Sequence, residues 1–272
     1  MQPSLSAFDD ALRELLSDLG AEIRARLRAR SGLDALRARE DGDTTHAFDA
    51  YAEEHILRLF QSTRLPVRFS SEESEDVDLV ADPSLLAVVD PLDGSAFLTR
   101  GHAVGSISVS VVDLESARPV LSRVLDVFAD VQYSAAEGRV TRNGASVRPS
   151  EVATLDRALV VTYASTSDRM AFLCRQLARW PRVGHVINHG GPLGMVKVGS
   201  GECDVAFEAS KGFMPRDYVA GAHIAQTAGA VVTQLDGSSL PFAANRVARV
   251  RFVAAANPAL HATVLELLSG ET

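Results

Sequence analysis

The sequence predicts a mixed α/β protein in which an α+β half is followed by an α/β half. Near the N-terminus, apolar residues recur every three or four positions in two stretches, which is typical of amphipathic helices. The middle of the chain carries short runs rich in Val, Ile and Ser, which are typical of strands joined by tight turns. Later, strand-like and helix-like segments alternate. These three patterns predict an α+β half over residues 1–145 and an α/β half over residues 146–272.

In the first half, two helices are expected, at residues 11–36 and 47–60. The polar segment 40–45 between them is expected to form a turn that caps the second helix. A short apolar run at residues 86–89 is typical of a buried strand, and it leads directly into Asp90. Further strands of one antiparallel sheet are expected at residues 104–112, 120–124 and 131–133.

In the second half, the alternating pattern predicts four strands and four helices. The strands are expected at residues 158–163, 203–207, 230–234 and 250–255. The helices are expected at residues 168–180, 192–199, 217–228 and 258–268. Cys174 lies on the apolar face of its helix and is predicted to belong to the core.

The composition excludes several classes of protein. Of the 272 residues, 46% are hydrophobic and 23% are charged, which is typical of a globular chain. The net charge of −8 makes a nucleic-acid partner unexpected. The apolar runs fall short of the roughly 18 residues of a membrane span, so no membrane partner is expected. Two cysteines, Cys174 and Cys203, exclude a disulfide scaffold and fit a reducing, cytoplasmic location.

Eight acidic residues and no Lys or Arg lie between Glu72 and Asp93. Such carboxylates repel one another unless water or a cation lies between them. Glu75, Asp76 and Asp78 are interpreted as a solvated acidic loop.

Asp90 and Asp93 differ from these loop acids because they directly follow a buried strand, in the segment Asp90-Pro91-Leu92-Asp93-Gly94-Ser95. Pro91 fixes φ, and Gly94 permits a tight turn and a close approach to a ligand. Both carboxylates and the Leu92 carbonyl can converge on one hard cation, and oxygen-only ligands suit Mg²⁺. A strand-to-turn cap with two surface acids is the open alternative.

Several segments resemble signatures of the inositol monophosphatase superfamily, in family order and across roughly residues 39 to 240. They are Asp41-Gly42-Asp43-Thr44-Thr45-His46-Ala47-Phe48-Asp49, Ser71-Glu72-Glu73-Ser74, Asp90-Pro91-Leu92-Asp93-Gly94-Ser95, Arg216-Asp217-Tyr218-Val219-Ala220-Gly221-Ala222, and residues 228–237. The stretch Phe97-Leu98-Thr99-Arg100-Gly101 and the gap between Glu208 and Asp217 resemble the archaeal-type enzymes, which act on inositol monophosphate and fructose 1,6-bisphosphate. The resemblance implies a layered αβαβα sandwich of the sugar-phosphatase type, a Mg²⁺-dependent phosphomonoesterase activity and a homodimer.

The resemblance also implies a role for particular residues. Glu72, Asp90, Asp93, Asp217 and the Leu92 carbonyl are expected to hold about two or three Mg²⁺ ions. The residues expected to act in catalysis are Asp49, Glu72 and Ser95, with Ser95 and Asp49 orienting the attacking water. The residues expected to contact a small phosphorylated metabolite are Asp93, Gly94, Ser95, Gly190, Gly191, Glu208 and Asp217.

Two departures from the family pattern bear on the substrate. Arg216 stands where the family carries Trp, and it adds a charge beside the expected metal site. His189 replaces a glycine, and an arginine that precedes it in the family is missing from residues 186–190. Tyr163 and Arg169 follow a strand and could reach the mouth of the site, although a surface charge on a helix is the favoured interpretation of Arg169.

Two alternatives to a phosphatase of inositol monophosphate or fructose 1,6-bisphosphate stay open. One is a phosphatase of 3′-phosphoadenosine 5′-phosphate, and the other is a weakly active binding or regulatory protein on the same scaffold. A zinc site at His185 and His189 is disfavoured because their Val- and Ile-rich segment is not expected to be helical. A calcium loop at Asp90 and Asp93 lacks the alternating acids that it requires.

Overall fold

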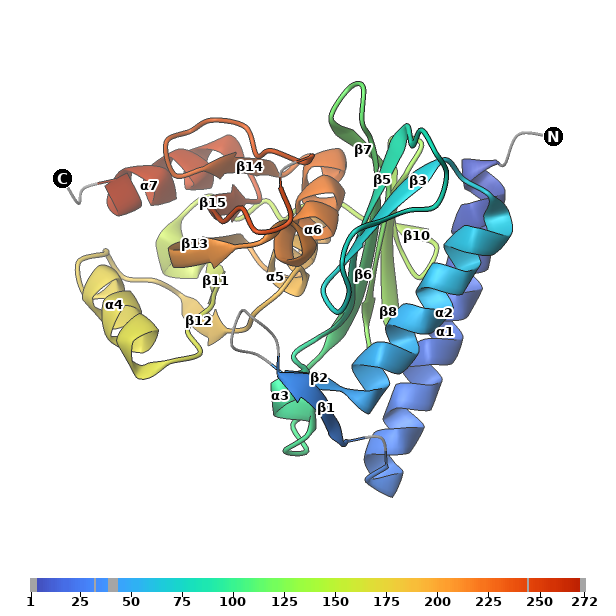
Figure 1. The fold of residues 1–272 in the computed structure, drawn as a ribbon. Coiled ribbons are helices and arrows are strands. Elements are labelled where there is room, and N and C mark those ends of the chain that lie inside the picture. The colour runs from blue at the N-terminus through green and yellow to red at the C-terminus, as the bar shows by residue number, and fades with distance from the viewer. Residues whose placement is uncertain (1–3, 32, 39–43, 244, 270–272) are drawn as a thin grey trace.

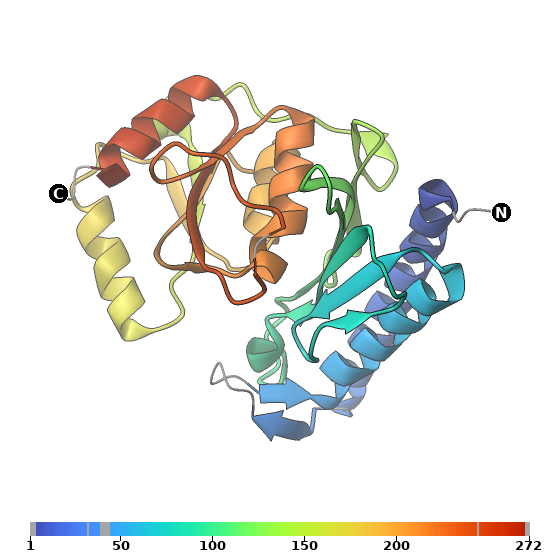
Figure 2. The same cartoon turned by 45° about the horizontal axis from the view of Figure 1, so that its top comes forward.

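Helical layers and β-sheets alternate through the molecule in the order α, β, α, β, α (Figure 1). The computed structural model describes residues 4–31, 33–38, 44–243 and 245–269. Figure 2 shows the same layers from a second direction, with helices on both outer faces and between the sheets. The predicted layered α/β sandwich is therefore confirmed.

The first sheet has eight strands within the described residues, in the order β10-β9-β8-β7-β6-β5-β3-β4. Neighbouring strands are antiparallel, except that β3 and β5 run parallel. Their bounds are β3 Val67–Ser71, β4 Val77–Asp78, β5 Leu85–Asp93, β6 Ser106–Asp113, β7 Arg118–Asp126, β8 Val131–Ala136, β9 Arg139–Arg142 and β10 Ala145–Ser146.

Two long helices, α1 (Leu5–Ala29) and α2 (Ala47–Thr63), cover the outer face of this sheet (Figure 1). The predicted end of the first helix at residue 36 is wrong. Arg30 adopts a left-handed conformation with φ 51°, which ends the helix. Leu36 lies instead in a short hairpin of β1 (Ala35–Ala38) and β2 (Thr44–His46).

The predicted capping turn at residues 40–45 lies partly outside the described residues, because 39–43 are not among them. The N-cap of α2 is His46, which follows that segment.

The second sheet has the order β12-β11-β13-β15-β14 in the described part of the chain. Strands β12, β11 and β13 are parallel to one another, while β15 runs antiparallel to both β13 and β14. The bounds are β11 Leu159–Thr162, β12 His185–Asn188, β13 Val205–Phe213, β14 Val231–Gln234 and β15 Val250–Ala255. Strand β12 was not predicted, because its exposed edge position leaves no alternation of buried and solvated side chains.

The outer face of the second sheet is covered by α4 (Ser167–Leu177) and α7 (Pro258–Ser269). The prediction that Cys174 is a core residue is wrong, because its side chain is exposed. The buried face of this segment is formed instead by Leu173, Gln176 and the following Trp180.

Between the sheets lie α5 (Leu193–Gly199) and α6 (Pro215–Ala228). Helix α6 is buried on both sides, since Ile224 belongs to a core cluster with first-sheet residues and Tyr218 belongs to a cluster that contains residues of both sheets. The two helices approach closely: a Cβ on Gly199 would lie 2.8 Å from the Ala225 Cα, and one on Gly221 would lie 2.6 Å from the Pro192 carbonyl. This packing fixes the N-terminus of α6 between the two sheets, where the candidate site lies.

None of the described helices is both long and apolar enough to cross a membrane.

Candidate active site

A cavity of about 390 Å³ opens where the ends of β3 and β5 meet the N-terminus of α6 and the second sheet. Its wall contains acidic and basic side chains in equal number among the described residues. The acidic residues are Glu72, Asp93, Glu208 and Asp217, and the basic residues are Arg169, Lys211, Arg216 and Arg249. Charges of both signs in one cavity suit a ligand that carries anionic groups together with a metal ion.

The segment from Asp90 to Ser95 forms the turn that the sequence predicts. Asp90 pairs with Ser108 and Asp93 pairs with Ser106, so one extra residue bulges out of β5. The Leu92 backbone N–H donates to Asp90 Oδ1 at 3.1 Å, which holds that carboxylate under the bulge.

Gly94 then turns the chain with φ 87°, and the one-turn helix α3 (Ser95–Leu98) follows. A Cβ at Gly94 would lie 3.0 Å from the Val104 carbonyl oxygen, so glycine is required here both for φ and for space. Gly94 and Ser95 both line the cavity, and so do Leu92 and Asp93.

Glu72 reaches the same place from the neighbouring strand. Strand β3 runs parallel to β5 with Ser71 opposite Val89, so the residues that follow the two strands lie at one edge of the sheet. Glu72 lines the cavity, whereas Glu73 is buried and accepts a hydrogen bond from Thr45.

Asp217 is delivered by α6 from the other half of the chain. It is the third residue of the helix, and its Oδ2 accepts from the Met214 backbone N–H at 2.8 Å in a capping arrangement. Burial, reinforced by the Glu72 carboxylate, raises the pKa of Asp217 to about 6, although the Arg216 guanidinium opposes the shift.

The carboxylates of this cluster act strongly on one another. Asp90 is only 1% exposed, and its pKa lies well above the usual value. The main cause is burial, followed by the negative charges of Glu72, Asp93 and Asp217. Repulsion among clustered carboxylates, in a donor set made of oxygen atoms, is the condition that a hard divalent cation relieves. The donor chemistry therefore fits Mg²⁺.

The carboxylate side chains of the cluster lie farther apart than the ligands of a single bound ion. Within the described residues, no three His, Cys, Asp or Glu side chains come together closely enough to coordinate one ion. Glu72 Oε1 lies 3.1 Å from Arg216 Nη2.

Glu208, on β13, lines the cavity and is 2% exposed. Its Oε1 accepts from the Ser210 N–H at 2.7 Å, the Ser210 hydroxyl at 2.6 Å and the Gly212 N–H at 3.2 Å. These bonds stabilise an irregularity in the pairing of β13 with β15.

Gly190 and Gly191 bring the second sheet against the turn from Asp90 to Ser95. Gly191 has φ 67°, and a Cβ there would lie 2.0 Å from Asp93 Oδ2. A Cβ at Gly190 would lie 2.7 Å from the Tyr163 ring. Arg169 also lines the cavity, with its guanidinium 5.8 Å from the centre of the Tyr163 ring. The favoured interpretation of Arg169 as a helix surface charge is therefore wrong.

Among the residues singled out in the sequence, Asp90, Asp49 and His189 do not line the cavity. Asp49 is 1% exposed near the start of α2, where its Oδ2 accepts from the His46 backbone N–H at 2.7 Å. His189 is largely buried beside the two glycines, and burial lowers its pKa.

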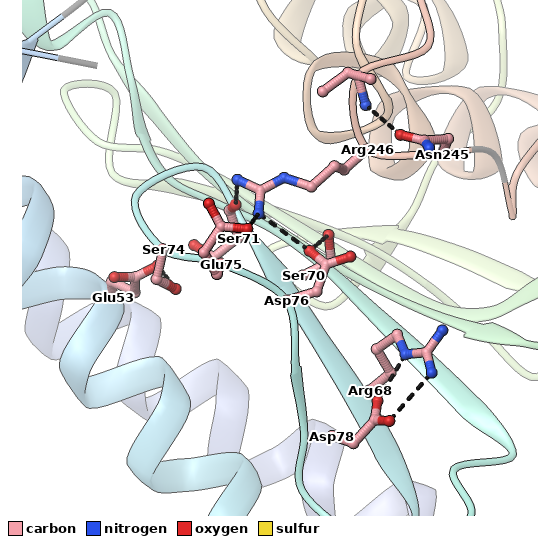
Figure 3. Close-up of polar contacts among 11 residues, drawn as sticks. Glu53, Arg68, Ser70, Ser71, Ser74, Glu75, Asp76, Asp78, Asn245 and Arg246 are labelled. Atoms are coloured by element: carbon pink, nitrogen blue, oxygen red, sulfur yellow. Dashed lines mark hydrogen bonds and ion pairs between the residues drawn. The ribbon is translucent and has the colours of Figure 1, made fainter. Parts of the chain in front are cut away.

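Lys211, Arg249 and Arg246 escaped sequence reasoning, since isolated basic residues carry no local signal. Arg246, in the segment between β14 and β15, contacts Ser71, Glu75 and Asp76 at the loop that follows β3 (Figure 3). Its Nη2 donates to the Ser71 carbonyl at 3.3 Å, and its Nη1 lies 3.5 Å from Glu75 and 3.4 Å from Asp76. The acidic loop, interpreted from sequence as solvated, is thus partly neutralised by one arginine.

Comparison with known protein families shows the family of the chain. A model of the inositol monophosphatase family matches residues 4–271. The chain belongs to the inositol monophosphatase family. Members of this family are metal-dependent phosphomonoesterases, and their substrates are phosphorylated metabolites. The resemblance predicted from the sequence motifs is therefore confirmed.

Individual family members are similar along most of the chain. A fructose-1,6-bisphosphatase/inositol-1-monophosphatase of Methanothermobacter thermautotrophicus is 29% identical over 241 residues, which cover 84% of each protein. A protein of the same name in Archaeoglobus fulgidus is 26% identical over 265 residues, covering 95% of this chain and 98% of the relative.

Solved structures of the family share the fold. The extragenic suppressor protein suhB of Bartonella henselae superposes with a TM-score of 0.83 at 19% identity, covering 98% of this chain and 100% of the other. An IMPase of Thermotoga maritima superposes with a TM-score of 0.79 at 21% identity, covering 96% of each chain.

Proposed function

We propose that this chain is a Mg²⁺-dependent phosphatase of small phosphorylated metabolites, acting on fructose 1,6-bisphosphate, inositol monophosphate or both. The observation that carries the proposal is the set of carboxylates at Glu72, Asp90, Asp93 and Asp217, which come from three separate segments and affect one another's charge. The shared name of the archaeal relatives supports the choice of substrates.

In this proposal, the two halves, residues 1–145 and 146–272, each contribute part of the metal site. Glu72, Asp90, Asp93, Asp217 and the Leu92 carbonyl would hold about two or three Mg²⁺ ions. When bound, Mg²⁺ supplies charge neutralisation for the phosphate and acidifies a water molecule.

The residues around the metal ligands would position the substrate. The backbone N–H groups of Gly94 and Ser95 would bind phosphate oxygens, since both residues line the cavity. Ser95 and Asp49 would orient the water for in-line attack, with Glu72 assisting, so no covalent phosphoenzyme is needed.

The substrate body would be recognised by the second half of the chain. Glu208 Oε2 makes no hydrogen bond to the described residues and would accept from a substrate hydroxyl. The Gly190 and Gly191 backbone would lie against the sugar or cyclitol. Asp93 and Asp217 would contact the substrate as well as the metal.

The basic residues of the cavity favour a substrate with more than one anionic group. Arg169, Lys211 and Arg249 line the cavity on the side of the second sheet, in addition to the arginine at the carboxylate cluster. A second anionic group on the substrate would lie against a cavity wall that carries these positive charges. Fructose 1,6-bisphosphate is therefore the first choice of substrate, and 3′-phosphoadenosine 5′-phosphate is the second.

The test is phosphate release from a panel of inositol 1-phosphate, fructose 1,6-bisphosphate, 3′-phosphoadenosine 5′-phosphate and NADP⁺. Asp93→Asn removes one proposed ligand, and Asp78→Asn is the matched control, because Asp78 pairs with Arg68 on the exposed β4 strand. We expect the highest kcat/KM with fructose 1,6-bisphosphate, loss of turnover in Asp93→Asn and wild-type turnover in Asp78→Asn. Absence of turnover on every ester would favour a binding or regulatory protein.

A cytoplasmic homodimer completes the proposal. It rests on the family resemblance, and light scattering of the purified protein would test it.

A further inference from the structure

Arg216 lies inside the carboxylate cluster rather than at its edge. Its Nη2 is 3.1 Å from Glu72 Oε1, and its Nε is 3.8 Å from Asp217 Oδ1. The Arg216 and Glu72 side chains are only 12% and 13% exposed, so water screens this ion pair weakly. The pair also joins α6 to the loop after β3, across the two halves of the chain.

The backbone of Arg216 is firmly placed. It stands between Pro215, the first residue of α6, and Asp217, which caps the helix. Its own carbonyl accepts a hydrogen bond from the Ser108 hydroxyl on β6 at 3.3 Å. The guanidinium is therefore presented to the cluster by a rigid element and lines the cavity in the structure.

The positive charge of Arg216 also acts on carboxylates other than Glu72. The Arg216 guanidinium acts against the upward pKa shifts of both Asp90 and Asp217. A single arginine thus partly neutralises three of the four carboxylates to which we assign the metal.

We propose that Arg216 is a built-in cation of the site, which competes with Mg²⁺ for the Glu72 carboxylate and thereby weakens Mg²⁺ binding. The inference rests on the proposed function, because it takes Glu72 as a metal ligand. A divalent ion at Glu72 must either displace the guanidinium or bind beside a like charge, and both cost free energy. The chain keeps its carboxylates partly neutralised without metal and takes up Mg²⁺ only where the concentration is high.

Direct binding measured by isothermal titration calorimetry tests this inference without any assay of turnover. Mg²⁺ is titrated into the full chain and into Arg216→Met, which retains much of the side-chain length but loses the charge. Arg216→Lys keeps the charge, and Arg216→Gln serves as a second neutral variant if the methionine variant does not fold. Arg246→Met is the matched control, since Arg246 contacts Ser71, Glu75 and Asp76 around the same loop (Figure 3).

We expect Mg²⁺ to bind Arg216→Met or Arg216→Gln at least about tenfold more tightly than the wild type. Arg216→Lys is expected to stay within a few-fold of the wild type, and Arg246→Met is expected to show no tightening. Equal or weaker binding by the neutral Arg216 variants would overturn the inference while leaving the proposed function intact. Equal tightening in Arg246→Met would also overturn it, because the effect would then be one of net charge. Failure of the wild type and all variants to bind Mg²⁺ would refute the metal site and both proposals.

Discussion

Replacing Gly191 by alanine tests whether the second half of the chain positions the Asp93 carboxylate. The new Cβ would lie 2.0 Å from Asp93 Oδ2 and 2.6 Å from Asp93 Cγ, whereas ordinary contacts begin at 3.4 Å. Gly191 also has φ 67°, a conformation that alanine adopts only with strain. Gly191→Ala therefore strains the backbone and pushes Asp93 out of place.

The backbone strain affects the free energy of unfolding, whereas the displacement of Asp93 affects kcat/KM, so the two effects can be measured separately. The left-handed conformation costs alanine about 1–2 kcal/mol, and overpacking adds about 1–3 kcal/mol. Relieving the contact with Asp93 Oδ2 requires a shift of about 1.4 Å, and a misplacement of about 1 Å already costs roughly 100-fold in rate. We therefore expect kcat/KM to fall about 100-fold, while the folded protein remains stable enough to assay.

Gly144→Ala is the matched control, because Gly144 has φ 81° and a Cβ there would meet nothing within 4 Å. Urea denaturation gives the free energy of unfolding of each variant, and phosphate release on the best substrate gives kcat/KM. Gly144→Ala should lose about 1–2 kcal/mol of stability and no activity. If Gly191→Ala is as active as Gly144→Ala, the proposed dependence of the metal site on this contact is refuted.

Two further predictions concern acid stability and the Glu72 loop. Burial lowers the pKa of His223 from 6.5 to about 4, so the unfolded chain takes up the proton first as the pH falls. The free energy of unfolding that this group contributes is complete above about pH 6.5 and falls by about 3 kcal/mol toward pH 4. Urea titrations at several pH values should show that His223→Asn loses less stability between about pH 6.5 and pH 4 than the wild type. An equal loss of stability in the two proteins would contradict the assignment. Arg246→Ala should raise the Mg²⁺ concentration for half-maximal rate about fivefold, because it frees the Ser71 carbonyl. Arg68→Ala breaks an ion pair at the exposed end of the same hairpin and should leave that concentration unchanged, so similar effects in the two variants would argue against a positioning role for Arg246.

The parts of the fold that the sequence predicts best are those with strong local patterns. The apolar run before Asp90 predicts a buried strand, and β5 covers it. The end of the first helix is harder to predict, because it depends on Arg30 in a left-handed conformation, which carries no composition signal.

In the candidate site, too, the locally encoded features can be predicted from the sequence and the long-range contacts cannot. The turn from Asp90 to Ser95 is encoded locally by proline, glycine and strand position, so it could be predicted. The ion pair of Arg216 with Glu72 joins residues that are far apart in sequence, and the contact of Gly191 with Asp93 does the same. Such contacts depend on how the two sheets pack around α6, and a single sequence holds no pairwise signal for them.

The most direct test of the central claim is phosphate release from the best substrate of the panel, measured with Mg²⁺ and with EDTA in wild type and Asp90→Asn. Asp90 is buried and does not line the cavity, so its replacement removes a proposed metal ligand without altering the cavity wall. We predict turnover with Mg²⁺, none with EDTA, recovery when Mg²⁺ is restored, and a loss of about 1,000-fold in Asp90→Asn. Turnover that survives EDTA, or an Asp90→Asn variant as active as the wild type, would contradict the account.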